Sequence, residues 1–185
     1  MLGSGSNLTS CIEEGVTDDA FRRSGRLGDG RHLLTALQDT GLHGWQLPEL
    51  RDMRMSGYSA KRRSFSWDRR GKWLATSGDA RAILWLFEGK IGPMGKAPMM
   101  LAERTDALVT QVAFHPKNDL LAVGYSDGVV TLARLADEHT LLLDAGVEDD
   151  GGAYVTVLAW NDAGTRLGWG GEDGRMGILN MDARA

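Results

Sequence analysis

The sequence predicts an all-β fold assembled from four repeats, each forming a small antiparallel sheet of four strands. The first observation is a six-residue pattern that recurs as VTDDAF at 16–21, VTQVAF at 109–114 and VTVLAW at 155–160. The second is its spacing, because the starts of the copies are separated by multiples of about 46 residues. The third is a set of turn residues after each copy. A fixed period of this size is typical of repeat architectures.

A fourth copy is hidden between the first two. The period places its start near residue 62, where RRSFSW keeps the small residue and the closing aromatic but lacks the Val-Thr pair. After an N-terminal segment at 1–15, the predicted repeats therefore span 16–61, 62–108, 109–154 and 155–185.

Turn signals divide each repeat into strands. In the last three repeats a leucine follows the closing aromatic by seven residues, at Leu74, Leu121 and Leu167. The Gly, Asn, Asp and Pro residues in between supply the backbone conformations of tight hairpins. A second turn containing Asp follows, and beyond it lie the predicted third strands, at 42–47, 82–87, 129–135 and 175–181. Fourth strands are predicted at 52–57, 98–103 and 140–145.

The first and last repeats depart from this pattern. The first contains extra residues at 22–26, which we interpret as an irregular insertion, and its first strand is the least apolar. The last repeat has no fourth strand of its own, and residues 6–13 could supply one.

Four short antiparallel strands in roughly 40 to 50 residues is the layout of a β-propeller blade. Helical repeats fit poorly, because the apolar segments are short, rich in β-branched or aromatic residues and bounded by turns. Trp45 and Trp85 stand where the WD-repeat family has the tryptophan of its Trp-Asp signature. The chain therefore resembles the WD-repeat (WD40) β-propeller family over about residues 14–182. The repeats are degenerate, because the aspartate of the signature is replaced by Gln46, Leu86, Arg134 and Asn180.

Four blades are fewer than this family usually has, and an open array leaves strand edges exposed. Three arrangements could account for a chain with four blades. The chain is the C-terminal part of a longer propeller, two chains join into eight blades, or four blades close into a ring. The irregular first repeat favours the longer propeller, and self-association comes second. In either case we expect the isolated chain to self-associate.

Composition narrows the class of partner. Glycine makes up 25 of the 185 residues, about twice the usual share, as expected for a chain with many turns. A net charge of −4 gives no indication of a nucleic acid or membrane partner. The single cysteine, Cys11, excludes an internal disulfide framework. Because no membrane span or signal peptide is visible, we expect a cytoplasmic protein.

No motif for catalysis, a cofactor or a metal stands out. The four histidines lack metal-ligand spacing, and the segment 89–96 does not have the register of a phosphate loop. His115, which precedes a proline, is interpreted as a turn former. We therefore expect a non-catalytic scaffold for protein–protein interaction, with no cofactor. The alternative is an enzyme or small-ligand binder that uses the central channel, but Arg62 and three valines occupy the starts of the first strands.

Surface loops are the remaining place for function. In a propeller, the loops between blades and those between second and third strands meet on one face. Their basic and acidic clusters could orient a partner, and Tyr and Arg are common energetic anchors. The candidate partner-binding residues are Tyr58, Lys61, Arg62, Arg63, Arg81, Arg104, Tyr125, Tyr154 and Glu172. By contrast, we expect Trp67, Phe114 and Trp160 in the core, because each closes an innermost strand.

Overall fold

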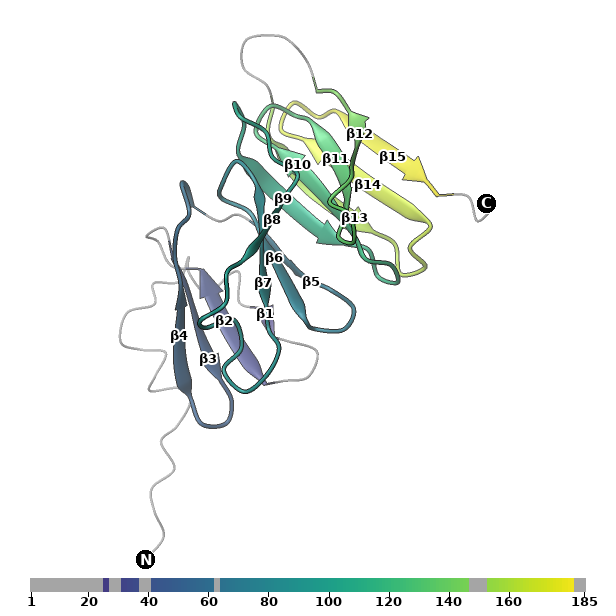
Figure 1. Cartoon of the computed structure of the whole chain (residues 1–185). Helices are drawn as coiled ribbons and strands as arrows, with labels where there is room; N and C mark the ends of the chain where they lie inside the picture. The colour runs from purple at the N-terminus through teal and green to yellow at the C-terminus, as the bar shows by residue number, and fades with distance from the viewer. Residues whose placement is uncertain (1–24, 27–30, 37–40, 62–63, 147–152, 182–185) are drawn as a thin grey trace, which may run out of the picture.

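The computed structural model describes residues 25–26, 31–36, 41–61, 64–146 and 153–181. These residues form fifteen strands and no helix. The strands make four antiparallel sheets in which each strand pairs with the next along the chain. We call the sheets blades 1 to 4, and Figure 1 shows them following one another in chain order. The predicted all-β propeller architecture is confirmed.

Three of the blades have four strands each, and the fourth has three among the described residues. Blade 1 contains β1 (Gly25–Arg26), β2 (His32–Ala36), β3 (Leu42–Gln46) and β4 (Arg51–Met55). Blade 2 contains β5 (Phe65–Trp67), β6 (Trp73–Thr76), β7 (Ala82–Leu86) and β8 (Met99–Leu101). Blade 3 contains β9 (Val109–Phe114), β10 (Leu120–Tyr125), β11 (Val130–Arg134) and β12 (Thr140–Asp144). Blade 4 contains β13 (Val155–Trp160), β14 (Arg166–Gly171) and β15 (Met176–Asn180), and has no fourth strand among the described residues.

The strand registers follow the constant offset seen in the sequence. Each closing aromatic lies opposite the leucine seven residues later, in the pairs Trp67–Leu74, Phe114–Leu121 and Trp160–Leu167. All predicted third and fourth strands overlap the observed strands. Because the side chains of a strand alternate between its faces, this register fixes which residues point to which neighbouring blade.

Blade 1 differs from its prediction. Residues 22–26 were interpreted as an irregular insertion, yet Gly25 and Arg26 form β1 and pair with Leu34 and Leu33. Gly25 and Arg26 carry no apolar alternation, so only their pairing with β2 identifies a strand here. The first strand predicted at 16–21, the N-terminal segment 1–15 and the candidate fourth strand at 6–13 lie outside the described residues.

Buried apolar residues gather in three clusters, one between each pair of consecutive blades. Leu34 and Met55 of blade 1 share a cluster with Trp85 of blade 2. Leu84 of blade 2 shares one with Leu121 of blade 3. The third joins Ala122, Val130 and Leu132 of blade 3 to Leu158 and Leu167 of blade 4. The blades therefore pack face to face, as in an arc of a propeller.

Hydroxyl groups join the innermost strands of consecutive blades. Ser66 Oγ accepts a hydrogen bond from the backbone N–H of Phe114 at 3.0 Å. Thr110 Oγ1 donates to the backbone oxygen of Val155 at 2.8 Å. Of the aromatic residues expected in the core, Phe114 is buried, whereas Trp67 and Trp160 are half-buried and pack against the clusters.

Candidate functional site

Two of the tyrosines expected on the surface are buried. Tyr58 follows β4 and lies in the cluster between blades 1 and 2. Its hydroxyl oxygen accepts a hydrogen bond from Trp85 Nε1 at 2.7 Å and lies 3.0 Å from Thr76 Oγ1. A buried phenol needs such partners. The placement of Tyr58 on a binding surface is therefore corrected: its ring stabilises the contact between two blades.

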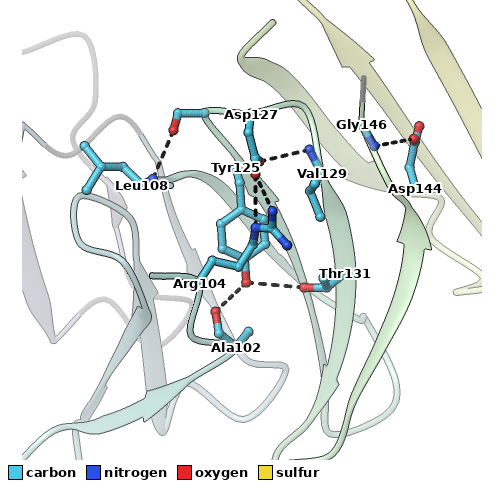
Figure 2. A network of polar contacts seen from close by, with 10 residues as sticks. Ala102, Arg104, Leu108, Tyr125, Asp127, Val129, Thr131, Asp144 and Gly146 are labelled. Carbon is cyan, nitrogen blue, oxygen red and sulfur yellow. Dashed lines mark hydrogen bonds and ion pairs between the residues drawn. The ribbon is translucent and has the colours of Figure 1, made fainter. Parts of the chain in front are cut away.

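Tyr125 needs the same correction. It ends β10, is fully buried, and donates a hydrogen bond from its hydroxyl to the backbone oxygen of Ala102. Thr131 Oγ1 lies 3.5 Å from the same hydroxyl. Burial raises the pKa of the Tyr125 phenol, so the group stays neutral and acts as a donor at neutral pH. Figure 2 shows the ring between β11 and the segment that follows β8.

Arg104 covers this tyrosine from the solvent side. Its guanidinium lies 5.5 Å from the centroid of the Tyr125 ring, a cation–π distance. Its Nε donates to Asp127 Oδ2 at 3.1 Å, and a second nitrogen contacts the same oxygen (Figure 2). The other carboxylate oxygen of Asp127 accepts from the N–H of Val129 at 3.2 Å. The network ties the segment after β8 to the β10–β11 turn, so it connects blades 2 and 3.

A pocket of about 520 Å³ opens beside this network. We call it the β8–β12 groove, because it lies between the outer strands of blades 2 and 3. Its lining residues are Arg81, Met100, Leu101, Ala102, Glu103, Arg104, Tyr125, Thr131, Glu138, Thr140 and Leu142. Its walls are partly apolar, since the side chain of Met100 is 38% exposed and that of Leu142 is 55% exposed. The groove therefore offers apolar area that no other part of the described chain covers.

Arg81 gives the groove a polar anchor. Its Nε is buried and has no hydrogen-bond acceptor among the described residues. The nearest carboxylate oxygen, Asp79 Oδ1, is 3.8 Å away, beyond hydrogen-bond distance. The Arg81 side chain as a whole is 38% exposed, so its guanidinium can still donate to a carboxylate that enters the groove. Arg81, Arg104 and Tyr125, three of the sequence candidates, thus meet at one place.

Known proteins with the same fold support this reading of the architecture. Residues 112–184 match the family model of the anaphase-promoting complex subunit 4 WD40 domain. The β-propeller domain of Cps50 (Swd1) from Myceliophteria thermophila superposes with a TM-score of 0.67 at 22% sequence identity. The chain therefore has the fold of a β-propeller. The superposition covers 85% of this chain and 50% of that one, so the chain spans half the length of the Cps50 propeller domain. A search of curated proteins gave no match.

The remaining candidates lie elsewhere on the propeller. Lys61 and Tyr154 line a smaller pocket of about 260 Å³ with Leu108 and Val109. Glu172 is exposed, and its backbone N–H donates to the backbone oxygen of Tyr154 at 2.9 Å. Arg62 and Arg63 lie outside the described residues. Of the sequence candidates, Arg81, Arg104 and Tyr125 thus line the β8–β12 groove, and Lys61 and Tyr154 line the smaller pocket.

The apolar walls of the groove were missed by sequence reasoning. A signal existed in TLLLD at 140–144, because Leu141 and Leu142 point to opposite faces of β12 and both are 55% exposed.

In the described part of the chain, no three His, Cys, Asp or Glu side chains form a group that could hold a metal ion. Nor does that part contain a helix long and apolar enough to cross a membrane.

The buried phenol predicts a difference in alkaline stability between the propeller and its Tyr125→Phe variant. Below about pH 10, the ordinary pKa of tyrosine, the phenol is protonated in both states and contributes fully. As the pH rises further, the unfolded chain ionises first, because burial raises the pKa of Tyr125 in the folded state. Urea unfolding from about pH 9 to about pH 11 should therefore show a steeper loss of stability in the wild type. Parallel losses in the two proteins would contradict this role.

Proposed function

We propose that this WD40 propeller is a non-catalytic module that binds an extended segment of another protein in the β8–β12 groove. The observation that carries the proposal is the combination of exposed apolar walls with the partly exposed guanidinium of Arg81 in one groove. WD40 propellers generally serve as interaction scaffolds, and the groove provides the kind of concave, mixed surface on which such binding depends.

The lining indicates what kind of segment would bind. One apolar side chain of the partner contacts Met100 and Leu142, and a neighbouring Asp or Glu accepts a hydrogen bond from Arg81. Glu103 and Glu138, which also line the groove, disfavour segments with several negative charges. The expected ligand is therefore a mostly apolar peptide with a single carboxylate near its anchor residue.

Chemistry in the central channel has less support. The first residues of β9 and β13, Val109 and Val155, are each 2% exposed and apolar. They offer no group for acid–base or nucleophilic catalysis.

We also propose a cytoplasmic location, which the single cysteine of the sequence supports.

Selection of peptides from a displayed random library tests the groove directly. Selected peptides should share an apolar residue beside one Asp or Glu. Leu142→Asp should weaken their binding at least about tenfold, because it places a charge on the apolar wall. Leu141→Asp is the matched control, since Leu141 has the same 55% exposure on the same strand but does not line the groove. Its binding should stay within about twofold of the wild type.

A second variant separates the two parts of the recognition. Arg81→Ala should remove the preference for an acidic residue while the apolar preference remains. Equal losses for Leu142→Asp and Leu141→Asp, or no enrichment of any peptide, would overturn the proposed site.

A further inference from the structure

The outer face of blade 4 is apolar and exposed. Val157 is 55% exposed, Met176 is 82% exposed and Ile178 is 66% exposed. Gly168 lies between them in the sheet, and a Cβ atom placed on it would meet no heavy atom within 4 Å. We call Thr156, Val157, Ala159, Gly168, Met176 and Ile178 the end face. None of these six residues is charged, and Arg166 and Asn180 continue the same side of the sheet beyond Gly168 and Ile178.

The repeat period shows what these positions do elsewhere in the chain. One period before Ala159, Gly168, Met176 and Ile178 stand Ala113, Ala122, Val130 and Leu132. These four residues of blade 3 are at most 9% exposed, because blade 4 covers them. The end face therefore has the composition of a contact between blades and lacks a neighbouring blade among the described residues.

A hydrogen bond that recurs in blades 3 and 4 supports the equivalence between the end face and the face of blade 3 that blade 4 covers. Thr110 Oγ1 lies 3.1 Å from the backbone oxygen of Gly124 and donates to that of Val155 in the next blade at 2.8 Å. One period later, Thr156 Oγ1 makes the first of these contacts, to Gly170 at 3.2 Å. The oxygen that would make the second contact belongs to the innermost strand of a covering blade. The end face thus presents polar as well as apolar features of a blade interface.

The opposite end of the array has the complementary pattern. In blade 1, Leu33 pairs with Trp45, just as Leu74 pairs with Trp85 in blade 2. Leu74 and Trp85 pack against the preceding blade, whereas Leu33 and Trp45 face away from blade 2 and are half-buried. This face of blade 1 therefore carries the residues with which a blade covers the end face of the one before it.

We propose that two copies of the chain join head to tail, with the end face of each covering blade 1 of the other. Two such contacts related by a twofold axis close a ring of eight blades, and no blade face is left exposed. The proposal goes beyond the groove and does not depend on it, since the groove lies between blades 2 and 3 of one copy.

Light scattering coupled to size-exclusion chromatography tests the number of copies. The wild type should have twice the chain mass of 20.1 kDa. The double variant Met176→Asp, Ile178→Asp should have the single-chain mass with an unchanged circular dichroism spectrum, because both side chains are exposed. A matched double variant, Ile91→Asp with Met94→Asp, changes exposed apolar residues of the β7–β8 loop and should remain dimeric. A monomeric wild type, or a dimer unaffected by the end-face changes, would overturn the proposal.

The head-to-tail arrangement needs its own readout, because two end faces could also meet each other. A photo-crosslinking amino acid in place of Ile178 should give a product of two chain masses. Mass spectrometry should place the new bond in residues 31–55 of the second copy. A bond to residues 153–181 of the second copy would show that two end faces meet and would refute the ring.

Discussion

Leu121→Ala is expected to lower the free energy of unfolding by about 2 to 5 kcal/mol. Leu121 is fully buried in the cluster between blades 2 and 3, opposite Phe114 and Ala133 in the sheet. The substitution removes apolar contacts and leaves a cavity that packed sheets fill only in part. For a chain of this length, the melting temperature should fall by about 5 to 15 °C. Thermal and urea unfolding followed by circular dichroism measure both values.

Leu141→Ala is the control for this variant. Leu141 is 55% exposed, so the same change of side chain should alter stability by no more than about 0.5 kcal/mol. Both proteins must be compared at one concentration, because self-association would add to the stability of each. Similar losses in the two variants would mean that the cluster between blades 2 and 3 does not hold the array together.

The strand pattern was predictable because it depends on short-range rules. The offset from each closing aromatic to Leu74, Leu121 or Leu167 fixes the register of a hairpin, and turn residues mark where it reverses. Blade 1 was predicted less well. Gly25 and Arg26 carry no apolar alternation, so nothing in that segment indicates a strand until its pairing with β2 is known.

The candidate site was predicted only in part, because it depends on how blades pack. Arg81 and Arg104 were selected for their loop positions, and the structure brings both to one groove. Tyr58 and Tyr125 were also assigned to loops, but loop residues have no periodicity that shows whether a ring turns inward. Both rings turn inward, since apolar space and hydrogen-bond partners lie between the blades. Leu142 was missed because its role depends on the distance to a neighbouring blade.

Gly164→Ala is the second change with a large expected effect. Gly164 has φ of 73°, a left-handed conformation that costs a residue with a Cβ atom about 1 to 2 kcal/mol. In addition, the new Cβ would lie 2.6 Å from Nε2 of the buried His115. Nε2 bonds the backbone oxygen of Gly164 at 2.8 Å, while Nδ1 accepts from the N–H groups of Lys117 and Asn118. The ring cannot move away without losing these bonds.

Gly174→Ala separates the collision from the backbone strain. Gly174 has φ of 82°, but a Cβ atom there would meet nothing within 4 Å. We expect it to lose only the conformational cost of about 1 to 2 kcal/mol. Gly164→Ala should lose about 3 to 5 kcal/mol in total, since the displaced imidazole also leaves buried groups unsatisfied. Urea unfolding measures the difference, and hydrogen exchange should show protection lost first in residues 155–180, because His115 joins blade 3 to the β13–β14 turn. Equal losses in the two variants would mean that the contact between His115 and Gly164 contributes nothing to the packing of blade 4.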